Sequence, residues 1–424
     1  LLPRSRPLLL RPHPEPPMTT VRAVTLREIR LRLKEPFRIS SGETWDRRIL
    51  LVAVEGEGSG RQATGWGECV AGEYPSYGSE TIDTARWALR EWLVPRLLGA
   101  GVHHPREVFP LLDRNLRGHR MAKAALEMAC WELAARLAGE PLARLLGGER
   151  REVEAGISLG IQETPAALAA KARAALERGY RKVKVKIRPG ADREYLDPLR
   201  RELGPGFPLA VDANAAYTPA DFDRLAAFDE LGLLMIEQPL EGGDLLRHAR
   251  LQRRMATPLC LDESIPSPER AEDMIELGAG RIVNVKPGRV GGFAQSLAIH
   301  DLCRAAGVPV WCGGMLESGV GRGHNVALAS LPGFTMPGDL SPSERYWERD
   351  VVVPEWGMDG EGRVGVPWGR AGMGVEVDLE RVEGLTVWKE RFEVGEGEGG
   401  EGEGKEAEGE EGGGEGEVRG GGAG

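Results

Sequence analysis

The sequence has few cysteines and no long apolar run. Its five cysteines, among 424 residues, are widely spread and form no CxxC pair, so neither a disulfide framework nor a zinc site is predicted. The seven histidines show neither HxxxH nor HExxH spacing, which argues against a histidine metal site. No apolar run approaches the roughly 18 residues of a membrane span, and Leu8 to Leu10 is too short for a signal peptide. We therefore expect a reduced, cytoplasmic protein that does not enter a membrane.

A basic face for nucleic acid is also missing. The formal net charge is −10, but residues 395–424 alone contribute −8, because ten Glu oppose only Lys405 and Arg419. Residues 1–17 contribute +2, which leaves −4 for residues 18–394. That value is ordinary for a protein that does not bind nucleic acid.

Both ends of the chain have a biased composition. Residues 1–17 are rich in Pro and Arg without periodicity, and Met18 directly precedes the first patterned segment. We expect this leader to be disordered or untranslated. Residues 395–424 consist mostly of Gly and Glu, have almost nothing to bury, and are also expected to be disordered.

Between these ends the pattern changes once, near the pair Gly147-Gly148. Residues 18–150 are predicted to form an α+β domain, with strands over 21–33, 48–55 and 63–70 and helices over 80–98 and 119–138. Residues 346–394 become irregular and strand-like again. We expect this C-terminal segment to return and pack on the first domain.

Residues 151–345 alternate between short apolar runs and helical stretches. The runs are 157–159, 183–187, 209–211, 233–236, 259–261, 282–285 and 308–311, and helices are expected over 165–178, 219–228 and 293–306. Continuous apolar strands with intervening helices are typical of a parallel sheet buried on both faces, and this many repeats favour a (β/α) barrel. Function is then expected at the C-terminal ends of the strands.

Charged residues end five successive strands of this predicted barrel: Lys186, Asp212, Glu237, Asp262 and Lys286. One βα repeat separates each from the next, so we expect all five at the same height around the barrel mouth. A single Asp at a strand end could be a helix cap. Three converging carboxylates, however, repel one another unless a cation neutralises them. The three carboxylates are therefore predicted to hold a hard divalent ion, Mg²⁺ with Mn²⁺ as a plausible substitute.

Lys186 and Lys286 flank this predicted metal. A lysine with its reference pKa of ~10.4 is a poor base, but neighbouring positive charge can lower the pKa toward ~7 to 8. The metal, Lys184 beside Lys186, and Arg289 just beyond Lys286 are each expected to act in that direction. Such a lysine could remove a proton next to a metal-held carboxylate.

Five segments around these residues resemble the enolase superfamily, specifically its muconate-lactonizing subgroup: KVKVKIRPG, VDANAAYT, IEQPL, LDES and NVKPGRVGG. The similarity covers about residues 18–394. Two later motifs, WCGGMLESGVGRGHNVALASLPGF and PGDLSPSERYW, are similar to the branch that contains o-succinylbenzoate synthases and N-acylamino acid (N-succinylamino acid) racemases. The resemblance implies a (β/α)₇β modified TIM barrel, with an α+β capping domain built from the N-terminal segment and C-terminal strands.

The resemblance also implies two candidate reactions on a small carboxylate substrate. In the synthase, Lys186 would take a proton from 2-succinyl-6-hydroxy-2,4-cyclohexadiene-1-carboxylate and return it to the departing hydroxide, during menaquinone synthesis. In the racemase, Lys186 and Lys286 would act as opposing acid and base on an N-acyl amino acid. Dehydration can proceed with Lys286 permanently cationic, whereas racemisation requires it to shed a proton. Arg289, if it faces Lys286, would therefore favour racemisation.

Other residues match weaker features of this branch. Its substrate-contacting positions correspond to Ser158, Asn214, Gly314, Met315 and Leu316, while Glu263 would steady Lys286 or the metal ligands. Packing or loop geometry is the alternative for each. Phe37, Arg38 and Tyr74 lie in segments that resemble capping loops over the site. Family members often form homo-oligomers, so assembly is also expected.

Three other functions are disfavoured or ranked lower. Muconate cycloisomerase and dipeptide epimerase are further relatives, but PGDLSPSERYW lacks the DxD pattern associated with the epimerases. A catalytically inactive binding protein would have an eroded site, whereas all five strand-end residues are intact.

Overall fold

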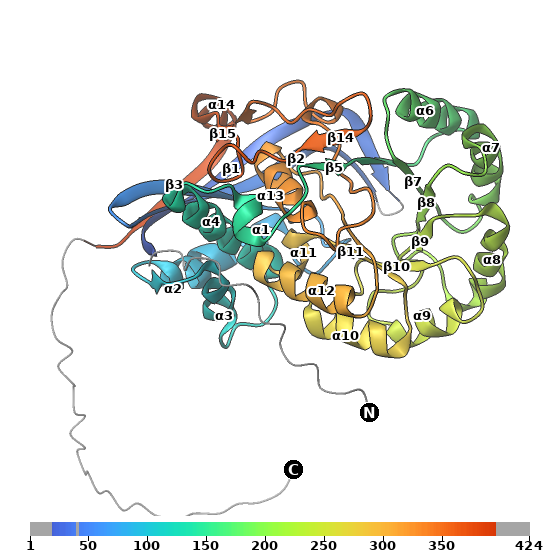
Figure 1. The fold of residues 1–424 in the computed structure, drawn as a ribbon, viewed down its shortest axis with the longest axis horizontal. Helices are drawn as coiled ribbons and strands as arrows, with labels where there is room; N and C mark the ends of the chain where they lie inside the picture. The colour runs from blue at the N-terminus through green and yellow to red at the C-terminus, as the bar shows by residue number, and fades with distance from the viewer. Residues whose placement is uncertain (1–18, 40–41, 396–424) are drawn as a thin grey trace, which may run out of the picture. The chain divides into compact units, whose positions relative to one another are not determined.

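The computed structural model describes residues 19–39 and 42–395. The predictions for residues 1–17 and for the Gly/Glu segment from residue 396 onward lie outside this range. Within it, one antiparallel and one parallel sheet account for most of the strands (Figure 1). Residues up to Glu393 belong to one unit by their contacts, so the division near residue 150 stays a prediction.

The antiparallel sheet has the order β16-β1-β2-β3, with β4 added on β1. Its strands are β1 (Thr19–Ile39), β2 (Gly42–Gly58), β3 (Arg61–Cys69), β4 (Gly101–Val102) and β16 (Thr386–Glu393). The pairing of β16 with β1 runs from Ala23↔Glu393 to Ile29↔Thr386. The end of the described chain therefore returns to the first sheet, as the resemblance implied.

Helices α1 and α4 pack on this sheet, and the others of this region pack on α4 or on one another. They are α1 (Ile82–Ala88), η1 (Leu89–Leu93), α2 (Val94–Leu97), η2 (Pro105–Glu107), α3 (Val108–Asp113), α4 (Arg120–Ala138) and α5 (Leu142–Leu146). Helix α4 lies so close to β3 that a Cβ on Gly65 or Gly67 would come within 2.1 Å of Ala129 O or 1.9 Å of Ala125 O. Only glycine fits at these two positions of β3.

The helix predicted over residues 80–98 is confirmed from Ile82 to Leu97, but it contains a π-helical turn. Residues Leu89–Leu93 form a π-helical turn between α1 and α2, and Pro95 occupies the first turn of α2. Proline lacks the N–H that a regular α-helix would use at this position, and the adjacent π-helical turn accommodates it without ending the helix.

Seven parallel strands form the second sheet, in the order β12-β11-β10-β9-β8-β7-β6. They are β6 (Gly156–Leu159), β7 (Lys182–Lys186), β8 (Leu209–Asp212), β9 (Met235–Glu237), β10 (Leu259–Leu261), β11 (Ile282–Val285) and β12 (Val310–Cys312). The apolar runs predicted from the sequence contain all of them, to within one or two residues. This curled parallel sheet, together with the separate N-terminal sheet, confirms the predicted fold class.

Helices follow the strands around the outside of this sheet (Figure 1). They are α6 (Pro165–Glu177), α7 (Arg193–Leu203), η3 (Pro219–Asp221), α8 (Phe222–Ala226), η4 (Ala227–Leu231), α9 (Leu245–Gln252), α10 (Pro268–Leu277), α11 (Pro287–Val290), α12 (Phe293–Ala305) and α13 (Gly319–Ala329). The helix expected over 219–228 is thus a short α-helix between two 3₁₀ turns.

The remaining elements are short: β5 (Glu152–Glu154), η5 (Ser343–Arg345), β13 (Val352–Val353), β14 (Arg363–Gly365), β15 (Glu376–Val377) and α14 (Leu379–Leu385). Strands β14 and β5 pair with each other, as do β13 and β15.

A non-strand segment fills the seam between β6 and β12, which do not pair directly. Ala155 and Val310 lie on opposite sides of it, in isolated bridges with Gly338 and Phe334 of the segment respectively. Gly156 N donates to Gly338 O at 2.6 Å, and Asp339 N donates to Cys312 O at 2.8 Å. This segment carries Asp339 into the barrel. Inside the barrel, an apolar cluster is formed by Ala210, Met235, Cys260, Ile282 and Trp311.

Candidate active site

The five charged residues lie at or just beyond the C-terminal ends of successive strands, but not all at one register level. Lys186 pairs with Asp212, which pairs with Glu237. Glu237 is level with Cys260 rather than with Asp262, and Cys260 is level with Ile282. Asp262 and Lys286 are therefore offset in strand register from the other three residues, and their equal height at the barrel mouth stays a prediction. Barrel strands tilt, so residues at one height along the barrel axis drift in hydrogen-bond register.

The Lys186 ammonium is held between two groups from the end of β8. It donates to Asp212 Oδ2 and to Asn214 Oδ1, each at 2.6 Å. Asn214 has a left-handed backbone (φ 43°), and its own N–H donates to Asp212 Oδ1 at 3.0 Å. Its amide also donates to Glu263 Oε1 at 3.3 Å. The tight turn after β8 thus links Lys186 to Glu263.

Lys184 lies one step deeper on the same interior side of β7. Its Nζ is 2.9 Å from Glu237 Oε2, 3.5 Å from Asp212 Oδ2 and 2.8 Å from Asp339 Oδ2. Both Lys184 and Glu237 are buried. Glu237 also accepts a 2.7 Å hydrogen bond from Asn284 Nδ2.

The Asp262 carboxylate, on the other side of the site, accepts hydrogen bonds from three side chains. Lys286 Nζ donates to it at 2.7 Å and the Tyr77 hydroxyl at 2.8 Å, and Arg289 makes a closer contact. Lys286 Nζ also lies 3.2 Å from the Tyr77 oxygen. The remaining Arg289 donors go to the backbone oxygens of Ile265 and Asn284.

These contacts correct one expectation about Lys286. Burial alone lowers the pKa of this ammonium, but the carboxylates, with Asp262 foremost, raise it overall well above its ordinary value. Arg289 is bound to Asp262 rather than placed against Lys286. The net shift of the Lys286 pKa is therefore opposite to the predicted lowering, although Arg289 competes with Lys286 for Asp262 and so acts in the predicted direction.

The three carboxylates do not titrate alike. Burial acts to raise the pKa of both Asp212 and Asp262, but neighbouring cations outweigh it and lower the pKa of each overall. For Asp212 these cations are Lys186 and Lys184. For Asp262 the main one is Lys286. Burial, followed by the charge of Asp212, raises the pKa of Glu237 to about 7. Burial and Asp262 likewise raise the pKa of Glu263 to about 8. Burial and the neighbouring carboxylates therefore oppose the ionisation of Glu237 and Glu263.

Among the described residues, no three His, Cys, Asp or Glu side chains are arranged to hold a metal as they stand. Each of the three carboxylates instead faces a lysine of the chain. The donor set nevertheless fits a hard divalent ion, because it consists of oxygens only and one member has a raised pKa. Glu237 Oε2 is also buried without a well-directed hydrogen bond from any described residue, despite its proximity to Lys184.

Four more residues were predicted to contact substrate: Ser158, Gly314, Met315 and Leu316. Ser158 on β6 is the register partner of Lys184. Gly314 lies against the backbone of Asp339. The N–H of Met315 donates to Glu317 at 2.8 Å, and Leu316, with a left-handed φ of 57°, lies against the main apolar core. These four residues therefore lie around the site rather than on its lysines, and their contact with substrate stays a prediction.

The residue that reaches the site from the predicted capping loops is Tyr77, rather than Phe37, Arg38 or Tyr74. Tyr74 is 77% exposed, and Arg38 pairs with Glu43 and Glu163. Phe37, at the far end of β1, packs at the edge of the main core. Tyr77, three residues after Tyr74, is the side chain that reaches Asp262 and Lys286.

Three residues of the site were not identified from the sequence: Tyr77, Asn284 and Asp339. Asn284 precedes Lys286 by two residues, so the period-2 alternation of a strand could have placed it on the same interior side. Asp339 lies in the PGDLSPSERYW motif, but no strand pattern marks it. Tyr77 comes from a loop and carries no periodic signal.

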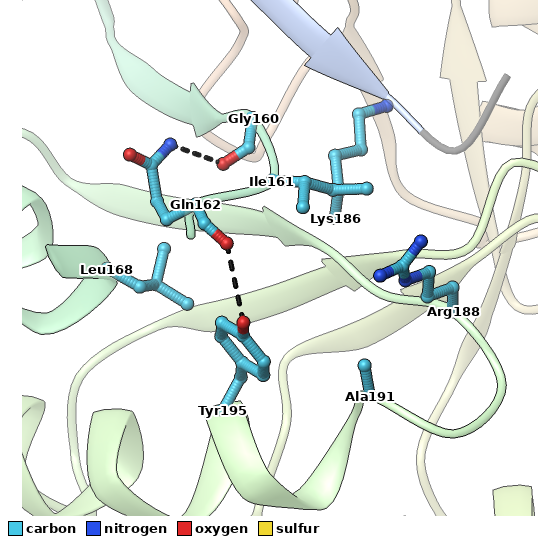
Figure 2. A pocket seen from close by; sticks show the side chains of 8 residues that line it. All are labelled: Gly160, Ile161, Gln162, Leu168, Lys186, Arg188, Ala191 and Tyr195. Atoms are coloured by element: carbon cyan, nitrogen blue, oxygen red, sulfur yellow. Dashed lines mark hydrogen bonds between the residues drawn. The ribbon is translucent and has the colours of Figure 1, made fainter. Parts of the chain in front are cut away.

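Several cavities lined by described residues border the site. One of about 340 Å³ is lined by Ser76, Tyr77, Asn214, Ala215, Glu241, Gly242, Gly243 and Glu263. A smaller one of about 20 Å³ lies beside Lys186 (Figure 2), where Gln162 accepts through its backbone oxygen from the Tyr195 hydroxyl at 3.4 Å. In Figure 2 the Lys186 side chain extends away from Tyr195, with its Nζ at the far end. Space for a small molecule therefore exists beside Tyr77 and Asn214.

Comparison with known proteins identifies the family. Residues 167–382 match the family described as "Enolase C-terminal domain-like", and residues 21–147 match the "Mandelate racemase / muconate lactonizing enzyme, N-terminal domain". The chain belongs to the enolase superfamily. The resemblance stated from its motifs is thereby confirmed, and members of this superfamily of enzymes generally bind Mg²⁺.

Similar proteins of the superfamily carry two different names. The chain is 46% identical, over 369 residues, to the o-succinylbenzoate synthase of Geobacillus stearothermophilus, covering 87% of this chain and 96% of that protein. It is 47% identical, over 370 residues, to the N-succinylamino acid racemase of Thermus thermophilus, covering 87% and 98%. Sequence identity therefore does not separate a synthase from a racemase.

Solved structures agree on the fold. An enolase superfamily member from Listeria innocua matches with a TM-score of 0.84 at 35% identity, covering 88% of this chain and 99% of that one. A dipeptide epimerase from Cytophaga hutchinsonii, complexed with Mg and a dipeptide, matches with a TM-score of 0.80 at 26% identity, covering 88% and 99%. No helix of the described residues is long and apolar enough to cross a membrane.

Proposed function

We propose that this chain is an o-succinylbenzoate synthase. It would remove water from 2-succinyl-6-hydroxy-2,4-cyclohexadiene-1-carboxylate to give 2-succinylbenzoate in menaquinone biosynthesis. The observation that carries the proposal is the position of Lys186 and Lys286, which flank three carboxylates at the strand ends. The 46% identity to synthases supports it.

Asp212, Glu237 and Asp262 would hold Mg²⁺, for which Mn²⁺ is a plausible substitute. When bound, this ion supplies the positive charge that a carboxylate needs as its neighbouring carbon loses a proton. Asn284 would keep Glu237 oriented through its 2.7 Å hydrogen bond. Tyr77 would do the same for Asp262.

Lys186 would act as the base. Its neutral amine takes the proton from the carbon next to the carboxylate, and the electron pair of that C–H bond moves toward the carboxylate. The C–O bond to the hydroxyl group then breaks, and Lys186 returns the proton to the departing hydroxide to form water. Lys286 remains an ammonium throughout and stabilises the negative charge. Its raised pKa suits this role.

The alternative is an N-succinylamino acid racemase, possible also as a second activity. The 47% identity to racemases supports it, as does the presence of a lysine on each side of the carboxylates. Racemisation requires Lys286 to give up a proton, which the carboxylate Asp262 at 2.7 Å opposes. We therefore place dehydration first.

A side-by-side assay tests the proposal. We expect dehydration with a higher kcat/KM than racemisation of an N-succinyl amino acid. Lys186→Ala should abolish both reactions, because both begin with proton removal. Dehydration that survives in this variant would exclude Lys186 as the base, and exclusive racemisation by the unaltered protein would favour the alternative.

Two further features belong to the proposal. The enzyme would act in the cytoplasm on a free small-molecule carboxylate, and would form a homo-oligomer.

A further inference from the structure

Asp339 contacts Lys184 more closely than either carboxylate at the strand ends does. The distance from Lys184 Nζ is 2.8 Å to Asp339, compared with 2.9 Å to Glu237 and 3.5 Å to Asp212. Asp339 does not lie on a strand of the parallel sheet. It enters the barrel from the seam between β6 and β12.

The backbone of Asp339 is fixed on both sides. Its N–H donates to Cys312 O at 2.8 Å, and its carbonyl oxygen accepts from Arg322 at 2.6 Å. The residue is 5% exposed, and its second carboxylate oxygen lies 3.6 Å from Lys182 Nζ. This carboxylate is therefore a rigid counter-charge for the two deeper lysines of β7.

The other two partners of Lys184 have a different task in the proposed function. Asp212 and Glu237 are proposed metal ligands, and a lysine that bonds fully to their oxygens competes with a cation for them. Asp339 is outside that ligand set, so its bond to Lys184 can persist whether or not a metal is present.

We propose that Asp339 is a positioning residue that holds the Lys184 ammonium and so leaves Asp212 and Glu237 available to a divalent cation. This inference rests on the proposed metal site. Without the carboxylate of Asp339, Lys184 would have only Asp212 and Glu237 as counter-charges. It would then bind them more strongly, and the cation would bind less strongly.

A double-mutant cycle measured by Mn²⁺ binding tests this role. Free Mn²⁺ is measured by electron paramagnetic resonance, at fixed pH and without substrate, for Asp339→Asn with Lys184 present and in the Lys184→Met background. We expect Asp339→Asn to weaken Mn²⁺ binding about tenfold when Lys184 is present, and less than about twofold when it is not. A direct charge effect of Asp339 on the cation would instead weaken binding equally in both backgrounds, and would overturn the inference.

Controls separate this role from a loss of folding. Ser341→Ala changes a buried residue on the same segment and should leave Mn²⁺ affinity unchanged. Asp339→Asn also removes the counter-charge of Lys182, so if it does not fold, the cycle is run in the Lys182→Met background. If the unaltered protein binds no Mn²⁺, the proposed metal site fails, and this inference with it. If it binds Mn²⁺ and Asp339→Asn binds equally well, only the role of Asp339 fails.

Discussion

Tyr77 connects the capping loop to both a proposed metal ligand and a lysine. Its hydroxyl donates to Asp262 at 2.8 Å and lies 3.2 Å from Lys286 Nζ. Burial, with the charge of Asp262, raises the pKa of this phenol, so the hydroxyl keeps its proton and remains a donor. The side chain can therefore fix the orientation of Asp262 throughout the reaction.

Removal of this hydroxyl should reduce the rate. A hydrogen bond to a charged group contributes about 1.5–3 kcal/mol, so we expect Tyr77→Phe to lower kcat at least tenfold, as measured in the dehydration assay at saturating Mg²⁺. Tyr74→Phe is the matched control, because Tyr74 is 77% exposed and its loss should not change kcat. Equal kcat values for Tyr77→Phe and the unaltered protein would contradict the assigned role.

Arg289 should matter more for racemisation than for dehydration. It shares Asp262 with Lys286, so in Arg289→Gln the carboxylate would pair with Lys286 alone and hold it more firmly as an ammonium. Dehydration tolerates this state, whereas racemisation does not. We therefore expect a loss of kcat/KM about tenfold larger for racemisation, equivalent to about 1.4 kcal/mol. The two kcat/KM ratios measured on one preparation give the answer, and equal losses would refute the reasoning.

The individual residues of the site were predictable where a repeat marked them. Lys186, Asp212 and Glu237 end consecutive strands and are true register partners. Asp262 and Lys286 were also found, although the strand tilt shifts them in register. Tyr77 and Asp339 enter from a loop and from the barrel seam, where no periodicity relates sequence position to direction.

At the scale of elements, Glu68 of β3 binds the first turn of α13 from the capping sheet. Its carboxylate accepts from Ser318 N at 3.1 Å, Ser318 Oγ at 2.6 Å and Gly321 N at 3.0 Å. A carboxylate at a helix N-terminus satisfies N–H groups that have no partner within the helix. This contact fastens the helix that follows β12 to the capping sheet.

The buried Glu68 carboxyl should make stability depend on pH. Burial raises its pKa to about 7, so between about pH 4.5 and pH 7 the folded state binds more protons than the unfolded state. The contribution of this residue to the free energy of unfolding therefore falls as pH rises through that window, by about 3 kcal/mol. We expect urea unfolding to show that the unaltered protein loses this much stability relative to Glu68→Gln between pH 4.5 and pH 8. A difference that is independent of pH would contradict the assignment.

The elements themselves followed from apolar periodicity, and the exceptions have local causes. The strands of the parallel sheet are short, apolar and buried on both faces, so their pattern is distinct. The helix over 80–98 was predicted correctly, but its π-helical turn was not, because it lies where Pro95 removes a backbone hydrogen bond. The close approach of α4 to Gly65 and Gly67 of β3 could not be predicted, because no sequence pattern indicates how near a helix lies to a strand.

At the scale of the whole molecule, the described fold should be more stable with its metal than without. Because a ligand that binds only the folded state adds RT ln(1 + [L]/Kd), Mg²⁺ at 100 times its Kd adds about 2.7 kcal/mol. We expect a rise in Tm of a few degrees when Mg²⁺ is added to chelated protein, and loss of activity in EDTA that Mg²⁺ restores. Activity that survives exhaustive chelation would refute the metal assignment. Glu237→Gln, which weakens one proposed ligand, should reduce the thermal shift.

The buried lysines of β7 should affect how the chain folds while the ribosome synthesises it. Lys182 and Lys184 are buried in the finished barrel, and the carboxylate they share, Asp339, is synthesised only after β12. In a shorter chain Lys184 would still face Asp212 and Glu237, but Lys182 would be buried without the carboxylate beside it, which is strongly destabilising for an ammonium. We therefore expect β7 to remain hydrated on the nascent chain until the seam segment has emerged, so that the barrel closes late and as a whole. A fragment that ends before Asp339 should then fail to insert β7 into a stable sheet, even though it contains every strand of the barrel.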